Sequence, residues 1–148
     1  MAEHGLQYFI DLDGDMLSRC LFELEHGVDE WARGGDLNVL FLDGTFSTNR
    51  AGLTLVAFTT VSSTGQTVVL AIGLLRSQSA LCYEWLYRRF HDVFKVKPAA
   101  VFTDSAIELE LSIVECSTIE TDIWHGVQHF LCTYHLSQNL FEHCKKSF

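Results

Sequence analysis

Proline, basic residues and long apolar runs are all scarce in this sequence. One proline and ten glycines among 148 residues argue against disorder and against a collagen-like repeat. No apolar run reaches the about 18 residues that a membrane-spanning helix needs, and the start Met1–His4 lacks the pattern of a secretory signal. Ten Lys and Arg residues against nineteen Asp and Glu give a net charge of −9, which argues against a generic nucleic-acid coating protein. We expect a nuclear or cytoplasmic protein that is not secreted and does not contact membranes.

Apolar residues are plentiful, at 48% of the chain, and aromatic residues add to the large side chains at 12%. This is enough to build one domain with a hydrophobic core. The five cysteines are scattered and odd in number. Without a secretory signal, we expect them to be reduced thiols.

The pattern of apolar residues predicts strands and helices in alternation. The predicted strands are Gln7–Asp13, Leu17–Glu25, Leu37–Asp43, Leu53–Ser62, Thr67–Leu75, Ala99–Asp104 and Trp124–Cys132. The predicted helices are Ser79–Phe94, with an apolar stripe of Leu81, Trp85, Leu86, Phe90, Val93 and Phe94, and Thr133–Lys146. The segment Ser105–Cys116 fits a strand or a helix. A hairpin that leads into alternating helices and strands predicts a mixed sheet with helices on its faces.

Two of the predicted strands end on an aspartate. The run Leu37–Leu42 leads into Asp43, and Val101–Thr103 leads into Asp104. Carboxylates at neighbouring strand ends can hold Mg²⁺ or Mn²⁺, which are hard cations that prefer oxygen ligands. The alternative is that each aspartate caps a turn or a helix, as aspartates after strands often do.

Cys132 and His135 form a Cys-x-x-His pair near the C-terminal end. A structural zinc site needs four ligands, and this pair supplies two of them. Further candidates nearby are Cys116, His125, His129, His143 and Cys144. A buried thiol and a histidine at a helix start explain the pair equally well without a metal.

The acidic segment Asp11–Asp15 offers a different function. It resembles the first motif of haloacid-dehalogenase phosphatases, with Asp11 as the nucleophile and Lys97, Asp104 and Glu108 in the later motifs. The predicted antiparallel hairpin between residues 53 and 75 does not fit the parallel sheet of those enzymes. This reading is therefore the weaker alternative.

Taken in order, several short motifs resemble the transposase domain of Mutator-like elements, the MULE family, which is related to FAR1-type proteins. The stretches that carry the resemblance are Leu40–Asn49, Leu74-Leu75, Tyr83–Leu86, Val101–Asp104 and Phe130–Asn139. The resemblance covers nearly the whole chain. It implies a ribonuclease-H-like fold, a mixed α/β sheet with helices on both faces, and it favours a helix for Ser105–Cys116.

The resemblance also implies a site. In the family, an Asp-Asp-Glu triad binds metal ions that cut and join DNA, and Asp43 and Asp104 match the first and second acids. Cys132 and His135 match a Cys-x-x-His motif that lies between the second and third acids. DNA is then the implied partner, a homo-oligomer is possible, and Mg²⁺ or Mn²⁺ is the implied cofactor.

The third acid is where the sequence departs from the family pattern, because Glu142 follows His135 closely and no other acid comes after it. We therefore expect a C-terminally truncated transposase core at 37–148, preceded by a strand hairpin and acidic connection at 1–36. Two functions follow: a transposase catalytic fragment, or a catalytically inactive interaction or regulatory module.

Overall fold

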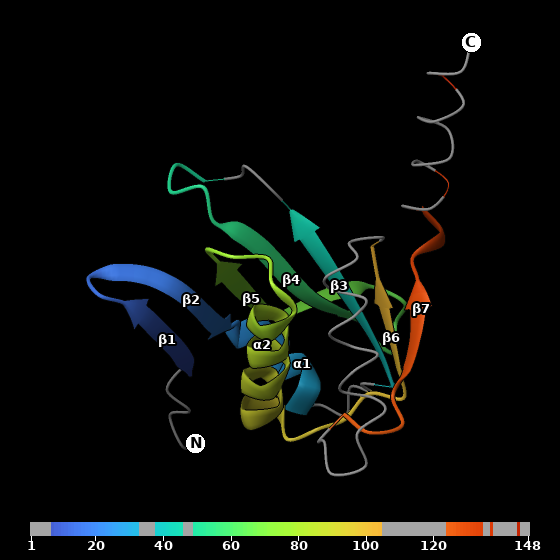
Figure 1. Ribbon diagram of the computed structural model, residues 1–148. Coiled ribbons are helices and arrows are strands. Elements are labelled where there is room, and N and C mark those ends of the chain that lie inside the picture. Colours follow the sequence, from blue (N-terminus) through green and yellow to red (C-terminus); the bar gives the residue numbers. More distant parts are fainter. Residues whose placement is uncertain are drawn as a thin grey trace.

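The computed structural model describes residues 7–32, 38–45, 49–104, 124–134, 137 and 145 (Figure 1). They form one seven-stranded sheet in the order β1-β2-β5-β4-β3-β6-β7. The strands are β1 Tyr8–Asp13, β2 Met16–Glu23, β3 Val39–Thr45, β4 Thr54–Val61, β5 Thr67–Leu75, β6 Ala100–Thr103 and β7 Gln128–Leu131. The described helices are α1 Glu25–Ala32 and α2 Ala80–Phe94.

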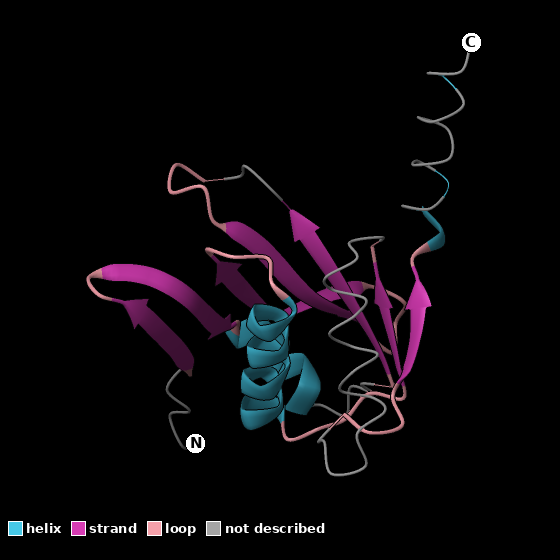
Figure 2. Ribbon diagram, viewed as in Figure 1, coloured by secondary structure: helices cyan, strands magenta, loops and turns pink. Residues whose placement is uncertain are grey.

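The sheet has an antiparallel part and a parallel part. Strands β1, β2, β5, β4 and β3 pair antiparallel in that spatial order, and β6 and β7 then add in parallel to β3. The arrows of β3, β6 and β7 consequently point in the same direction, so the C-terminal ends of these strands lie side by side (Figures 1 and 2). The predicted mixed α/β sheet is confirmed, whereas helices on both of its faces stay a prediction.

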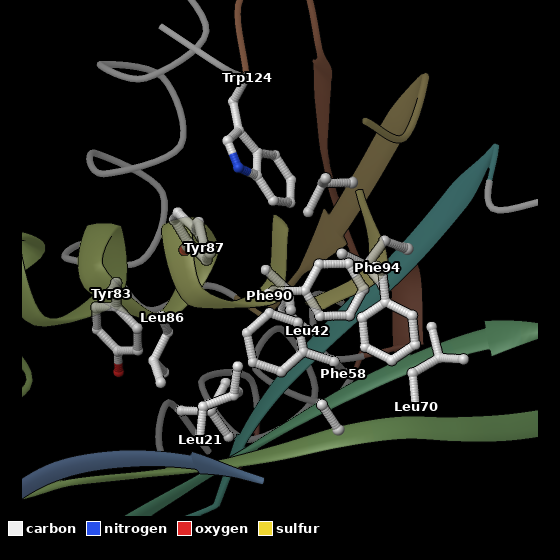
Figure 3. Close-up of a cluster of buried hydrophobic side chains, with 14 of the residues drawn as sticks. Leu21, Leu42, Phe58, Leu70, Tyr83, Leu86, Tyr87, Phe90, Phe94 and Trp124 are labelled. Carbon is white, nitrogen blue, oxygen red and sulfur yellow. The ribbon is translucent and has the colours of Figure 1, made fainter. Parts of the chain in front are cut away.

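Helix α2 lies across one face of the sheet and buries the core against it (Figure 3). Phe90 stacks on Phe58 of β4 with ring centroids 4.8 Å apart, and Tyr87 packs against Trp124 at 5.3 Å. Gly73 of β5 admits the helix, because a Cβ there would lie 2.7 Å from a Leu86 methyl carbon. Among the described residues no helix has the length and apolar character needed to cross a membrane.

The apolar stripe predicted for α2 is partly wrong. The buried residues are Tyr83, Leu86, Tyr87, Phe90 and Phe94. Leu81, placed on the stripe by its spacing, is 72% exposed. Trp85 and Val93 are half-buried beside the core. The buried stripe is rotated toward Tyr83 and Tyr87, whose large rings bury apolar surface.

Several strand ends differ from the prediction. The bounds of β5 are confirmed, but β3 continues beyond Asp43 to Thr45, so Asp43 lies within a strand. β6 runs from Ala100 to Thr103 and is one residue shorter at each end than predicted, so Asp104 lies directly after the strand. The strand predicted from Trp124 begins only at Gln128, because the residues before it form a turn with a positive φ at Gly126. Ser105–Cys116 and most of Thr133–Lys146 lie outside the described residues.

A cluster of rings and guanidinium groups joins the N-terminal hairpin to α2. The Arg19 guanidinium lies 5.0 Å from the centre of the Trp85 ring and donates a 2.7 Å hydrogen bond to Asp11. Arg89 lies over both Phe9 and Trp85, at 5.3 and 5.8 Å. The hairpin of β1 and β2 thus belongs to the same sheet as the rest of the chain, through the pairing of β2 with β5. It also contacts helix α2, which packs on that sheet. The division at residue 36 stays a prediction.

Replacing Trp85 by alanine tests this cluster. We expect Trp85→Ala to lower the free energy of unfolding by about 2 kcal/mol, since it removes a half-buried indole and its contacts with two arginines. Leu81→Ala, on the same helix but exposed, is the matched control and should change stability by less than about 0.5 kcal/mol. Urea unfolding followed by circular dichroism measures both. Equal stability of the two variants would contradict a stabilising role for the cluster.

Candidate metal centre at the ends of β3 and β6

The register between β3 and β6 brings the two candidate aspartates together. The strands pair in parallel from Val39 opposite Ala100 to Leu42 opposite Thr103. The next step along this register places Asp43 beside Asp104. Neighbouring strands lie about 4.8 Å apart, so the backbones of Asp43 and Asp104 lie close together.

The Asp104 carboxylate reaches over Gly44 toward helix α2. Its Oδ2 atom lies 3.8 Å from the position that a Cβ on residue 44 would take, and the Tyr83 hydroxyl lies 4.0 Å from the same point. Gly44 therefore leaves the space between the helix and the strand end open. Tyr83, almost fully buried on α2, is a neighbour of the site that the predicted helical stripe missed.

Asp43 lies at the other side of the same strand end. Side chains alternate along a strand, so Asp43 shares the face of Phe41, opposite to the buried Leu40 and Leu42. It is exposed and borders a cavity of about 260 Å³. The cavity is lined by Phe41, Leu42, Asp43, Thr59, Val61, Thr67, Phe102 and Cys132. The two aspartates are thus adjacent in the backbone, while their side chains leave it toward different faces.

Cys132 occupies the corresponding position after β7. Its main-chain N–H donates a 2.6 Å hydrogen bond to the Thr103 carbonyl, which sets it beside Asp104 on the side away from Asp43. Cys132 is a free thiol that borders the cavity. Its predicted zinc partner, His135, lies outside the described residues, as do Cys116, His143 and Cys144, so the zinc site stays a prediction.

Oxygen donors of the right type for Mg²⁺ or Mn²⁺ are present. Asp43 and Asp104 supply two carboxylates at one strand edge, which fits hard divalent cations. In the part of the chain that the structure describes, no three His, Cys, Asp or Glu side chains gather as a metal site. Glu142, the acid that follows His135, is not among the described residues. The described residues therefore contain two candidate ligands, Asp43 and Asp104, and the metal centre stays a prediction.

His129, named from the sequence as a candidate zinc ligand, instead forms a hydrogen-bonded pair with Thr103 beside Asp104. The Thr103 hydroxyl donates to the Asp104 main-chain carbonyl at 2.9 Å and lies 2.7 Å from Nε2 of His129. Thr103 is fully buried, and His129 comes from the neighbouring strand β7. Nothing in the local sequence around Asp104 points to His129, because parallel pairing joins segments that are distant in the chain.

Asp11, the nucleophile of the phosphatase alternative, lies far from Asp104. Asp11 is on β1, the edge strand on the far side of the sheet, and pairs with Arg19 of β2. Four strands, β2, β5, β4 and β3, separate β1 from β6. The structure does not bring Asp11 and Asp104 into one site.

The fold and the site define a mixed α/β domain with one aspartate within β3 and a second directly after the neighbouring strand β6. Its sequence matches the MULE transposase domain over residues 39–139, which is more than half of the chain. The chain belongs to the MULE transposase domain family.

Two curated relatives are similar to the chain over part of their length. Protein FAR1-RELATED SEQUENCE 6 of Arabidopsis thaliana is 32% identical over 76 residues, which cover 51% of this chain and 11% of that protein. The PKS-NRPS hybrid synthetase cheA of Chaetomium globosum is 26% identical over 113 residues, or 74% of this chain and 2% of that protein. The chain therefore spans a small share of both relatives.

Two substitutions at Gly44 test the open space beside Asp104. Gly44→Ala places a methyl group at ordinary contact distance from Asp104 and Tyr83, so we expect an unchanged melting temperature and unchanged Mn²⁺ affinity. Gly44→Leu fills the space and displaces the Asp104 carboxylate, so we expect at least about threefold weaker Mn²⁺ binding, by analogy with the cost of disturbing ligand orientation. Isothermal titration calorimetry on folded protein measures the affinity. Unchanged binding by the leucine variant would show that this space does not serve the metal.

Proposed function

We propose that this domain is a fragment of a ribonuclease-H-like transposase core that acts on DNA phosphodiesters. The strand order β5-β4-β3-β6-β7 supports the fold, with three antiparallel strands, two added parallel strands and one acid on the central strand β3. Membership of the MULE transposase domain family supports the chemistry. The observation that carries the proposal is the parallel register that sets Asp43 beside Asp104.

In this proposal Asp43 and Asp104 hold Mg²⁺ or Mn²⁺. When bound, such ions activate a water or hydroxyl nucleophile and stabilise the leaving oxygen in phosphodiester cleavage and strand transfer. The chain's own contribution is to fix two carboxylates at one sheet edge. β3 supplies one from within a strand, and the end of β6 supplies the other. DNA as the partner is part of the same proposal, and self-association stays a prediction from the resemblance.

The second candidate is a catalytically inactive interaction or regulatory module. It is favoured by the different faces toward which Asp43 and Asp104 extend, and by the two-ligand set among the described residues. The net charge of −9 also opposes tight binding of DNA without cations. The phosphatase alternative has less support, because four strands lie between Asp11 and Asp104.

Removing either carboxylate tests the metal centre. We expect Asp43→Asn and Asp104→Asn to weaken Mn²⁺ binding, measured by electron paramagnetic resonance of the free ion, by more than about tenfold, because even the loss of a group that only orients a ligand costs about that much. Asp13→Asn, which removes the same charge from the exposed hairpin, is the control and should bind Mn²⁺ as the wild type does.

Nicking of a supercoiled plasmid in Mg²⁺ or Mn²⁺ separates the two candidate functions. Nicking that is lost in Asp43→Asn and kept in Asp13→Asn supports the transposase fragment. Mn²⁺ binding that depends on both acids but brings no nicking supports the inactive module. Nicking that persists in both aspartate variants would rule out these residues as the centre.

A further inference from the structure

The backbone that carries Asp104 is held by hydrogen bonds at two successive carbonyl groups. The carbonyl of Thr103 accepts from the Cys132 N–H at 2.6 Å, and the carbonyl of Asp104 accepts from the Thr103 hydroxyl at 2.9 Å. Asp104 follows the last residue of β6, where the sheet pairing no longer fixes the chain. The Thr103 hydroxyl therefore extends the order of the strand by one residue.

The single proton of the Thr103 hydroxyl defines the role of His129. A hydroxyl donates one hydrogen bond and accepts others. Both contacts are hydrogen bonds at the same time only when the Thr103 proton goes to the Asp104 carbonyl and Nε2 of His129 carries a hydrogen that it donates to Thr103. The chain of donors runs from His129 through Thr103 to Asp104, across two neighbouring parallel strands.

The Thr103 hydroxyl is buried and therefore depends on its hydrogen bonds. Thr103 has no exposed surface, and its partners along the register include the buried Leu42 of β3. A hydroxyl costs free energy in such a place unless it is hydrogen-bonded. Valine has a similar shape and would avoid that cost, so packing alone does not account for a threonine here.

We propose that Thr103 and His129 are positioning residues that hold the Asp104 carboxylate in place for metal binding. This inference rests on the proposed metal centre. Neither residue touches the ion in the proposal. His129 orients the Thr103 hydroxyl, and the hydroxyl fixes the Asp104 main chain from which the carboxylate extends.

Thr103→Val and Thr103→Ser, tested with Mn²⁺ alone, separate positioning from packing. We expect Thr103→Val to bind Mn²⁺ about tenfold more weakly, within the range seen when groups that orient metal ligands are lost. Thr103→Ser keeps the hydroxyl and should restore affinity to within about twofold of wild type. The matched control is Thr60→Val, since Thr60 is also buried and its hydroxyl donates to the Val39 carbonyl at 2.7 Å within the same sheet. It should lose stability without losing Mn²⁺ affinity.

The nitrogen-15 NMR signals of the His129 ring in wild-type protein give a test without metal. We expect Nε2 to carry the hydrogen, and the signal of that ring N–H to be lost in Thr103→Val, where the hydrogen exchanges faster with water. A neutral ring with its hydrogen on Nδ1 would make Nε2 an acceptor, reverse the direction of the chain, and overturn the inference even if no variant folds.

The outcomes distinguish this inference from the proposed function. Wild-type protein that binds no Mn²⁺ contradicts the metal centre itself, and the positioning role falls with it. Wild-type binding that Thr103→Val retains in full contradicts the positioning role alone. Equal losses in Thr103→Val and Thr60→Val would show that general loosening of the sheet, and not Asp104, causes the effect.

Discussion

The parallel pairing of β3 with β6 is the contact on which the rest of the site depends. It spans four residue pairs, and it alone brings Asp43 next to Asp104. Parallel strands need a crossover connection. Helix α2, which follows β5 and precedes β6 in the chain, is part of this connection and packs on the sheet. The core under α2 and the position of the acids are therefore linked, because a shift of the helix would move the start of β6.

The short parallel strands receive support from aromatic rings on both faces. On the face of α2, Tyr87 packs against Trp124, just before β7. On the other face, Phe102 stacks between Phe41 and Phe130, with ring centroids 5.2 Å apart on each side. Parallel pairing is slightly less stable per residue than antiparallel pairing, and this row of rings across three strands offsets the difference directly below the strand ends.

The sequence was most informative where a local pattern decides the structure. The Val, Thr and Phe residues of Leu53–Ser62 and Thr67–Leu75, with the turn signal at Ser63–Gln66 between them, predicted β4, β5 and their hairpin. The end of α2 before Pro98 was also predicted. Spacing failed at Leu81, because α2 turns Tyr83 and Tyr87 toward the core and leaves Leu81 exposed. The Thr103–His129 contact was not predictable, since it depends on the register of two strands whose pairing no local pattern specifies. The third acid and His135 stay predictions.

The register shift in the pairing of β1 with β2 affects how the molecule behaves among its own copies. β1 is an edge strand of the sheet, and its side chains Tyr8, Ile10 and Leu12 are exposed. A flat apolar strand at a sheet edge is a template on which another chain can add. Here the register shifts between Asp11 and Leu12, and such a bulge increases the local twist of a strand. Together with the carboxylates of Asp11 and Asp13, this twist hinders growth of the sheet from one molecule to the next and so counters aggregation at that edge.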